Sequence, residues 1–289
     1  MSHFCHSWAL HWLRFSFFLL LSVVLWIGPQ SSAWAQGLMV PRQGSLQERL
    51  ANYPHWTTLP PMGQHKGEIH YPDWLTGTWQ VTSTLIEQVA PLAPAIVSPG
   101  FANNDSYLNR PIAFTVKFDT KTTLPEFTWA LSDLMQTSAV VLPDRRFNAE
   151  AITTAYLGND LNFSVQVISQ PMPRIVTIFG PNQRLTSTVI GYHQEAPNES
   201  EFIATEFSTQ QFVNGDSQYL NQVETTTDYQ QQEDGRIAAT QITAVYLSPQ
   251  DPDYFSAHNR PIALYRYQLS LEPEWRETHS SRHSVNSSQ

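Results

Sequence analysis

Histidine is the side chain in this sequence best suited to proton transfer or to binding a haem iron, because its pKa lies near neutrality. His193 stands beside Tyr192 at the end of an alternating run and is the strongest isolated candidate, with His258 behind it. A histidine at a turn is more often a solvated surface residue, and both interpretations stay open. His65 and His70 could form a metal pair, but two histidines in a loop are usually solvated, so we predict no metal site.

Two acidic pairs also stand near turns. Catalytic carboxylates need a walled cleft that shifts their pKa values, so turn positions favour solvated loop ends. The sequence contains no Gly-x-Ser-x-Gly elbow, no His-Glu-x-x-His, no phosphate-binding glycine loop and no dinucleotide fingerprint. We therefore predict no catalytic residue and favour a non-enzymatic role, although the sequence leaves enzyme activity undecided. The pairs are Glu199 with Glu201 and Asp251 with Asp253.

The N-terminus has the pattern of a secretory signal. Arg14 precedes an apolar run at 15–27, and Ala33-Trp34-Ala35 offers a small-x-small cleavage site. The run is short for a membrane span, so we predict a signal peptide over 1–35 that is cleaved, with a retained anchor as the alternative.

The 254 residues after position 35 contain no cysteine, since Cys5 is the only one in the chain. They cannot form a disulfide or use a thiol, and must rely on core burial for stability. They hold 15 basic and 25 acidic residues. This negative balance repels phosphate backbones, so nucleic acid is not an expected partner, and we expect a monomer.

From residue 77 onward, apolar and polar residues alternate with the period of a strand, and turn residues bound each run. The pattern predicts an all-β fold in which about 8–10 antiparallel up-and-down strands close into a barrel. The excursion at 120–144 could contain a short helix or a covering flap. The strands are expected near 78–89, 112–119, 149–157, 161–167, 174–179, 185–192, 202–213, 218–229, 237–247 and 262–271.

The sequence divides into four predicted parts: the signal at 1–35, an irregular lead at 36–70, the barrel at 71–272 and a disordered tail at 273–289. Ser45 could cap a short helix within the lead. Residues 109–113 (Asn-Arg-Pro-Ile-Ala) recur as 259–263. We favour two equivalent loops that lead into strands, proline being tolerated at a first strand position. Alternatively, Arg110 and Arg260 flank one rim and bind an anionic head group.

Gly77-Thr78-Trp79, preceded by the turn at 72–75 and opening the first strand, resembles the lipocalin (calycin) signature. The resemblance implies that Trp79 plugs the floor of the barrel, where Gly77 permits close approach. It also implies a basic residue from the last strand packed over the indole, for which Arg266 is preferred to Arg276. About ten strands without disulfides resemble the fatty-acid-binding or nitrobindin-like end of that superfamily.

More broadly, an exported acidic chain with this opening and strand run resembles an uncharacterised exported domain family of cyanobacteria and chloroplasts. The resemblance implies a thylakoid-lumen or periplasmic location and assigns no catalytic residue.

The interior of the predicted barrel is the place where function is expected. Small closed barrels are filled by side chains or hold one ligand, and the sequence leaves these two states open. We predict that a hydrophobic or amphipathic molecule (pigment, quinone, lipid or tetrapyrrole) binds there, although the cofactor itself is unknown. An accessory protein that docks on a photosynthetic membrane complex is the alternative, and an isomerase or lyase the third. The expected ligand-binding residues are Phe114, Phe163, Tyr192, His193, Tyr219, Tyr265 and Tyr267.

Overall fold

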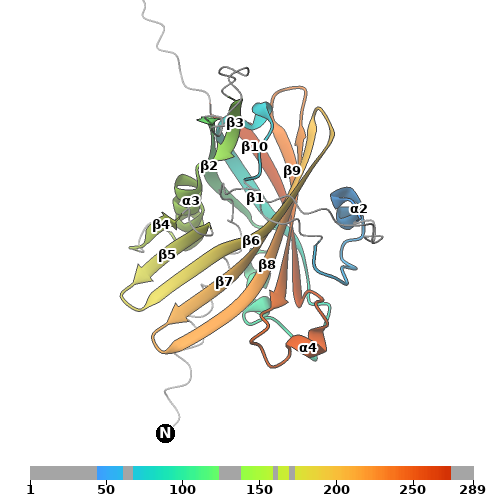
Figure 1. Ribbon diagram of the computed structural model, residues 1–289, viewed down its shortest axis with the longest axis vertical. Coiled ribbons are helices and arrows are strands. Elements are labelled where there is room, and N and C mark those ends of the chain that lie inside the picture. Colours follow the sequence, from blue (N-terminus) through green and yellow to red (C-terminus); the bar gives the residue numbers. More distant parts are fainter. Residues whose placement is uncertain (1–43, 61–67, 124–137, 159–161, 169–172, 275–289) are drawn as a thin grey trace, which may run out of the picture.

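The computed structural model describes residues 44–60, 68–123, 138–158, 162–168 and 173–274 (Figure 1). The predicted signal at 1–35, the segment at 124–137 and the tail after 274 lie outside these ranges. Ten antiparallel strands dominate the described chain, as the alternation predicts. Among the described helices, none has both the length and the apolar character needed to cross a membrane.

A single curled sheet contains all ten strands, in the order β3-β2-β1-β10-β9-β8-β7-β6-β5-β4. Strands that are consecutive along the chain pair with one another, except β3 and β4, and β10 also pairs with β1. The strands are β1 (Gly77–Val89), β2 (Pro111–Thr123), β3 (Ser138–Pro143), β4 (Ser164–Ile168), β5 (Arg174–Gly180), β6 (Gln183–Asn198), β7 (Glu201–Asn214), β8 (Ser217–Gln231), β9 (Ile237–Leu247) and β10 (Ala263–Pro273).

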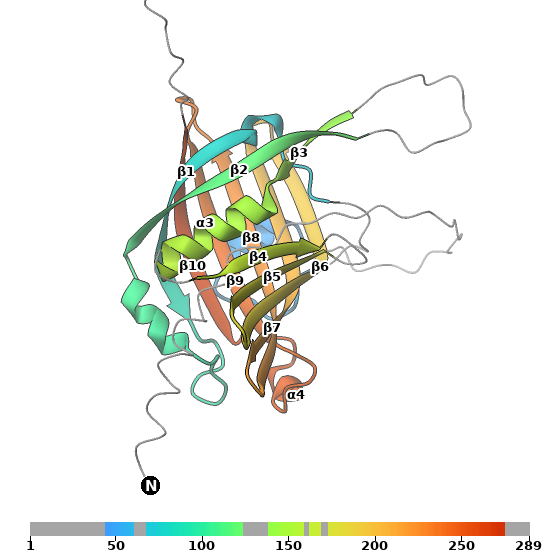
Figure 2. The ribbon, with the colours of Figure 1, turned by 90° about the vertical axis from the view of Figure 1, so that its left-hand side faces the viewer.

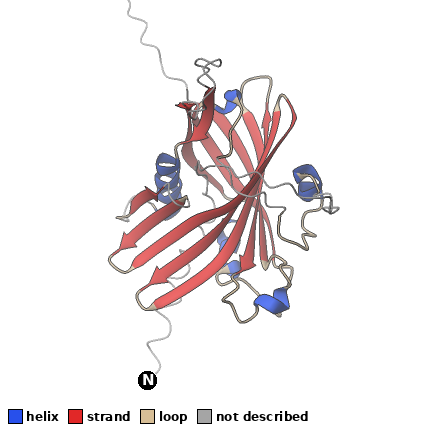
Figure 3. Cartoon of the chain, in the orientation of Figure 1, coloured by secondary structure: helices blue, strands red, loops and turns tan. Residues whose placement is uncertain are grey.

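The predicted closure of the barrel is wrong: β3 and β4 are the two edges of an open half-barrel and do not pair. Helix α3 (Arg145–Leu157) lies between these edges and packs on both β2 and β4 (Figures 2 and 3). The edge strands β3 and β4 are short, with six and five residues, and each pairs on one side only. A helix therefore takes the place of the missing strand pairing.

Helix α3 also replaces the strand predicted at 149–157, while β3 occupies a segment expected to be an excursion. Ile152 and Thr153 favour a strand by propensity. Asp144, however, caps a helix by accepting a hydrogen bond from the Phe147 amide at 3.0 Å. Buried positions at Ala149, Ile152 and Thr153 follow the helical period. Capping and periodicity outweigh the propensity of β-branched residues here.

The turn before β1 places Trp79 at one end of the sheet. A 3-10 turn at Asp73–Leu75 (η2) leads into Gly77, whose φ of 122° is accessible to glycine. The Trp79 side chain is 5 % exposed and donates from Nε1 to the Leu75 carbonyl at 2.9 Å. The indole is thus buried near the start of β1, where Trp79 pairs with Pro273 at the end of β10.

The two faces of the sheet have separate cores. The concave face carries the larger cluster, to which β1, β2, β7, β8, β9 and β10 contribute. On the convex face, Phe207, Ile242 and Leu264 pack against the N-terminal lead. The remaining described helices are α2 (Leu46–Ala51), η3 (Phe101–Tyr107) and α4 (Tyr254–Ala257).

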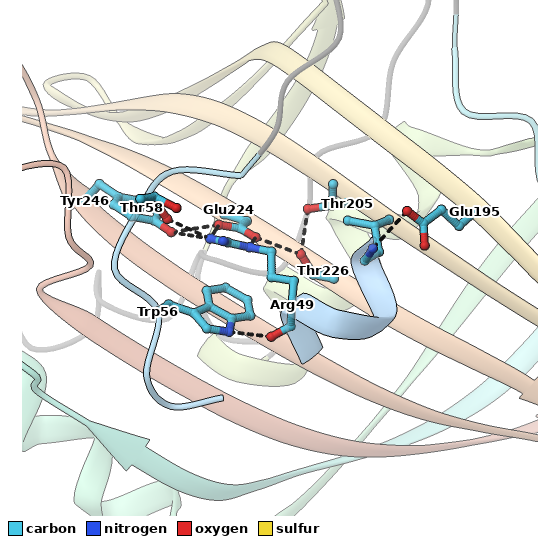
Figure 4. Close-up of polar contacts among 9 residues, drawn as sticks. Arg49, Trp56, Thr58, Glu195, Thr205, Glu224, Thr226 and Tyr246 are labelled. Carbon is cyan, nitrogen blue, oxygen red and sulfur yellow. Dashed lines mark hydrogen bonds and ion pairs between the residues drawn. The ribbon is translucent and has the colours of Figure 1, made fainter. Parts of the chain in front are cut away.

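The lead is clamped to the convex face by Arg49 of α2 (Figure 4). Its Nε lies 2.5 Å from Oε1 of Glu224 on β8, and its Nη2 donates to the Tyr246 hydroxyl at 2.9 Å. The guanidinium also stacks on Trp56, 4.0 Å from the ring centroid. Ser45 begins α2 with a capping box that involves Glu48, as its sequence suggested.

Candidate functional site

A cavity of about 100 Å³ lies between α3 and the concave face of the sheet. We call it the hollow. Its wall is largely apolar at the β1, β2 and β10 side and polar at the β7, β8 and β9 side. The wall includes Val81, Phe114, Phe118, Arg145, Ala204, Glu206, Tyr229 and Leu269.

The Asn148 side chain holds α3 over the hollow by bonding the backbone of β2, as a neighbouring strand would. Asn148 accepts a hydrogen bond from the Lys117 amide at 2.7 Å and donates to the Lys117 carbonyl at 3.1 Å. The Asp144 amide adds a bond of 2.9 Å to the same carbonyl. These contacts attach the first turn of α3 to β2, and that turn carries Arg145 into the hollow.

Arg145 is buried between two acidic side chains. Its Nη2 lies 3.9 Å from Oε1 of Glu68, and its Nη1 lies 3.7 Å from Oε2 of Glu206 on β7. Both distances exceed those of hydrogen bonds. Neither amino nitrogen of Arg145 donates a hydrogen bond to a described residue. The one guanidinium offsets only one of the two carboxylate charges in full, and its two amino nitrogens have no hydrogen-bond partner among the described residues.

Burial shifts the protonation of this cluster. It raises the pKa of Glu68 to about 7, although the positive charge of Arg145 acts in the opposite direction. It also lowers the pKa of Arg145 to about 10, while Glu206 and Glu68 favour the charged form. Arg145 is therefore cationic at neutral pH, and Glu68 titrates there.

Aromatic rings surround the cluster. Tyr71, which forms an isolated bridge with Val141 of β3, lies 5.0 Å from the Phe118 ring and 6.1 Å from the Tyr229 ring, centroid to centroid. Burial raises the pKa of Tyr229 to about 12 and that of Tyr71 well above its ordinary value. Both phenols are neutral at physiological pH, so they can act as hydrogen-bond donors.

The other half of the concave face is packed with side chains. Tyr265 and Tyr267, two predicted ligand residues, are 2 % and 5 % exposed and belong to the core, outside the hollow. Phe101 of η3 covers Tyr265 at 5.9 Å between centroids. The interior thus combines a half that is packed with side chains and a half that contains the hollow.

Of the remaining predicted ligand residues, Phe114 lines the hollow. Tyr192 on β6 lies opposite Glu206 and packs against the concave core beside the hollow. Phe163 pairs with Phe179, 6.5 Å between centroids, in a small cluster beneath α3.

His193 and Tyr219 lie away from the hollow. His193 belongs to the same convex side as α2: its Nε2 lies 3.2 Å from Glu195, whose carboxylate also accepts from the Leu46 amide. Tyr219 packs on Phe212 at 6.2 Å between centroids, near the start of β8. The structure therefore brings Phe114 and Tyr192 together with the charged cluster, but not His193 or Tyr219.

The structure does not bring Arg266 and Trp79 together. Arg266 lies opposite Glu87 near the other end of β1, and its guanidinium carbon is 5.6 Å from the Tyr53 ring centroid on the convex face. Arg276 falls outside the described residues. Of the repeated arginines, Arg110 and Arg260 are both exposed, and Arg260 donates to the Ala257 carbonyl at 3.1 Å.

The charged residues of the hollow were not among the predicted site residues. A signal for Glu206 is present in the sequence, because an acidic residue shares a strand face with Phe202 and Ala204. Arg145, which precedes the strand predicted at 149–157, carried no such signal, since only the first turn of α3 directs it inward. Glu68 comes from the lead, whose path over the hollow no local pattern specifies.

In the described part of the chain, no three histidine, cysteine, aspartate or glutamate side chains gather closely enough to hold a metal ion. Comparison with family models gives one match, over residues 63–274, to a family described as a domain of unknown function, DUF6816. Comparisons with curated proteins and with solved structures give no match. The matched range begins after the described lead at 44–60, and it includes the whole wall of the hollow.

Proposed function

We propose that this chain, which belongs to the DUF6816 family of unknown function, is an exported protein that binds a small amphipathic molecule in the hollow. The observation that carries the proposal is the buried Arg145, whose two amino nitrogens lie at a cavity with one apolar side and have no hydrogen-bond partners among the described residues.

A binding role fits the physical chemistry of this cavity. Ligand sites are concave and mostly apolar, with a few convergent polar groups that fix orientation. Phe114, Phe118 and Leu269 supply the apolar wall, and Arg145 supplies the polar focus. Leaving a buried charged group with unused donors costs free energy, and a bound acceptor would recover it. A pure packing role for Arg145 does not account for its position.

Cavity size restricts the ligand. An engineered cavity of about 150 Å³ in another protein holds a single benzene. The hollow, at about 100 Å³, is smaller, so it holds at most one small ring or a short chain end, and a whole tetrapyrrole exceeds it. Within the predicted set, the ring of a quinone or the end of a lipid fits the hollow.

The direct test is to purify the protein from its native compartment under mild conditions and identify by mass spectrometry what co-purifies. We expect a stoichiometric small molecule with a polar head and an apolar body. The purified protein is then titrated with small ring compounds, followed by ligand-observed nuclear magnetic resonance. A protein that carries no small molecule and binds no ring compound contradicts the proposal.

A second candidate function is docking on a membrane complex through the end of the sheet that carries α4. Phe255 of α4 is 81 % exposed and Val97 is 46 % exposed, and apolar side chains exposed together can mark an interaction site. If docking is the function, the wild-type protein sediments with membranes of its native compartment and Phe255→Ser does not. Location in the periplasm or thylakoid lumen remains part of the proposal, and an antibody against residues 44–274 tests it by fractionation.

A further inference from the structure

The charge balance around Arg145 defines what kind of head group the hollow accepts. One guanidinium faces two carboxylates, at 3.9 Å (Glu68) and 3.7 Å (Glu206). An anionic head that approached Arg145 would also approach both carboxylates. Like charges this close repel one another strongly in the low effective dielectric of a buried site. A carboxylate or phosphate head is therefore disfavoured, although the only cation in the wall attracts it.

A cationic head is disfavoured for the opposite reason. It would have to approach Glu68 or Glu206 without approaching the guanidinium, which lies within 4 Å of both. An uncharged head avoids both penalties. It leaves the internal compensation of the three side chains intact, and it uses hydrogen-bonding capacity that the cluster does not use itself.

That unused capacity is specific. Both amino nitrogens of Arg145 are donors without a partner, and Oε2 of Glu68 is an acceptor without one, among the described residues. A carbonyl oxygen of a ligand can accept hydrogen bonds from the Arg145 amino nitrogens. An N–H or O–H on the adjacent ligand atom can donate to Oε2 of Glu68. The two requirements are close together, because Nη2 of Arg145 lies 3.9 Å from the other oxygen of the same Glu68 carboxylate, Oε1.

We propose that the hollow selects a single-ring compound with an uncharged head that pairs a carbonyl acceptor with an adjacent N–H or O–H donor. The carbonyl accepts from Arg145, the donor bonds Glu68, and the ring packs among Tyr71, Phe118 and Tyr229. This inference rests on the proposed function, and it adds the chemistry of the head group to it.

Three ring compounds of nearly the same shape separate the possibilities: benzamide (uncharged carbonyl with N–H), benzoate (anion) and benzamidinium (cation). Toluene serves as the ring without a head. Each is titrated into the purified protein at pH 8, and the dissociation constants are compared. We expect benzamide to bind at least about tenfold more tightly than the other three, in line with hydrogen bonds to charged groups. Benzoate or benzamidinium binding as tightly as benzamide overturns the head-group assignment, while the hollow remains a binding site.

Variants test the residues named. Arg145→Met should abolish the preference for benzamide over toluene. Glu68→Gln should strengthen benzoate relative to benzamide by about tenfold or more, because one repelling charge is removed. Since Arg145→Met could fail to fold, Glu68→Gln keeps the test decisive. Glu150→Gln on the exposed side of α3 is the matched control and should leave all ratios unchanged. If none of the four compounds binds the wild-type protein, the proposed function itself fails.

Discussion

Arg49 and Glu224 form a buried ion pair that joins the N-terminal lead to the sheet, with Nε 2.5 Å from Oε1 and the Glu224 side chain fully buried. The second carboxylate oxygen accepts from Nη2 of Arg49 at 2.6 Å and from the Tyr246 hydroxyl at 2.7 Å. The pair is bidentate and both of its carboxylate oxygens are satisfied, which is the arrangement in which a buried ion pair is stable.

Removing one partner of this pair should destabilise the protein strongly. Arg49→Met leaves the Glu224 carboxylate buried without its counter-charge, and we expect the free energy of unfolding to fall by about 3–5 kcal/mol. Urea denaturation measures it. The double variant Arg49→Met/Glu224→Met should recover most of the loss. Arg146→Met, which removes an exposed pair with Glu150, is the control and should change stability by less than about 0.5 kcal/mol. A double variant as unstable as Arg49→Met contradicts this account.

The buried Trp79 indole near the start of β1 should contribute as much to the unfolding free energy as the Arg49–Glu224 pair. Trp79→Ala removes a large aromatic side chain that is 5 % exposed, and we expect a loss of about 3–5 kcal/mol in unfolding free energy. Phe255→Ala, at a side chain that is 81 % exposed, should stay within about 0.5 kcal/mol of the wild type. Thermal and urea unfolding report both. An unchanged melting temperature for Trp79→Ala would show that the indole does not stabilise the fold.

Glu68 should make stability depend on pH. Its pKa rises from 4.5 to about 7 on burial, so the folded chain holds this proton more tightly than the unfolded chain. The contribution of Glu68 is present in full at low pH and is lost as pH rises from about 4.5 to about 7. The unfolding free energy of the wild type, measured relative to Glu68→Gln, should fall by up to about 3 kcal/mol between pH 4.5 and pH 8. A difference that is flat or rises over this range disproves the assignment.

Filling the hollow should abolish binding without unfolding the protein. Ala204 lines the hollow and is 5 % exposed, so Ala204→Leu places three more carbon atoms in the cavity. We expect affinity for benzamide to fall by about tenfold or more, with a melting temperature equal to or above that of the wild type. Ala238→Leu, on the other face of the sheet, should leave binding unchanged. Equal affinity in Ala204→Leu and wild type would place the ligand elsewhere.

Most of the strand pattern could be predicted, because an alternating run specifies both the element and its buried face. The run from Trp79 to Leu85 is buried at alternate positions, as expected. Alternation says little about whether the first and last edges meet. That depends on β3 and β4 being short and on α3 covering the gap, and the helix was obscured by its Ile and Thr residues.

The site was harder to predict because its polar residues come from three distant segments. Phe114 followed from its strand face, and it lines the hollow. Arg145, Glu68 and Glu206 converge only through the tertiary fold, so their charges appear unremarkable in isolation. Aromatic residues at regular strand positions, such as Tyr265 and Tyr267, were expected to bind ligand and instead fill the packed half.

Helix α3 has a consequence for how this fold can vary. In a fully hydrogen-bonded ring the circumference changes only in steps, since each added strand brings a whole ladder with a fixed stagger. Here one segment of the ring is held by side chains, with Asn148 as its main attachment to β2. A helix attached in this way can shift or tilt by small amounts while every ladder stays intact. The width of the interior can therefore be tuned continuously, by substitutions along one helical surface.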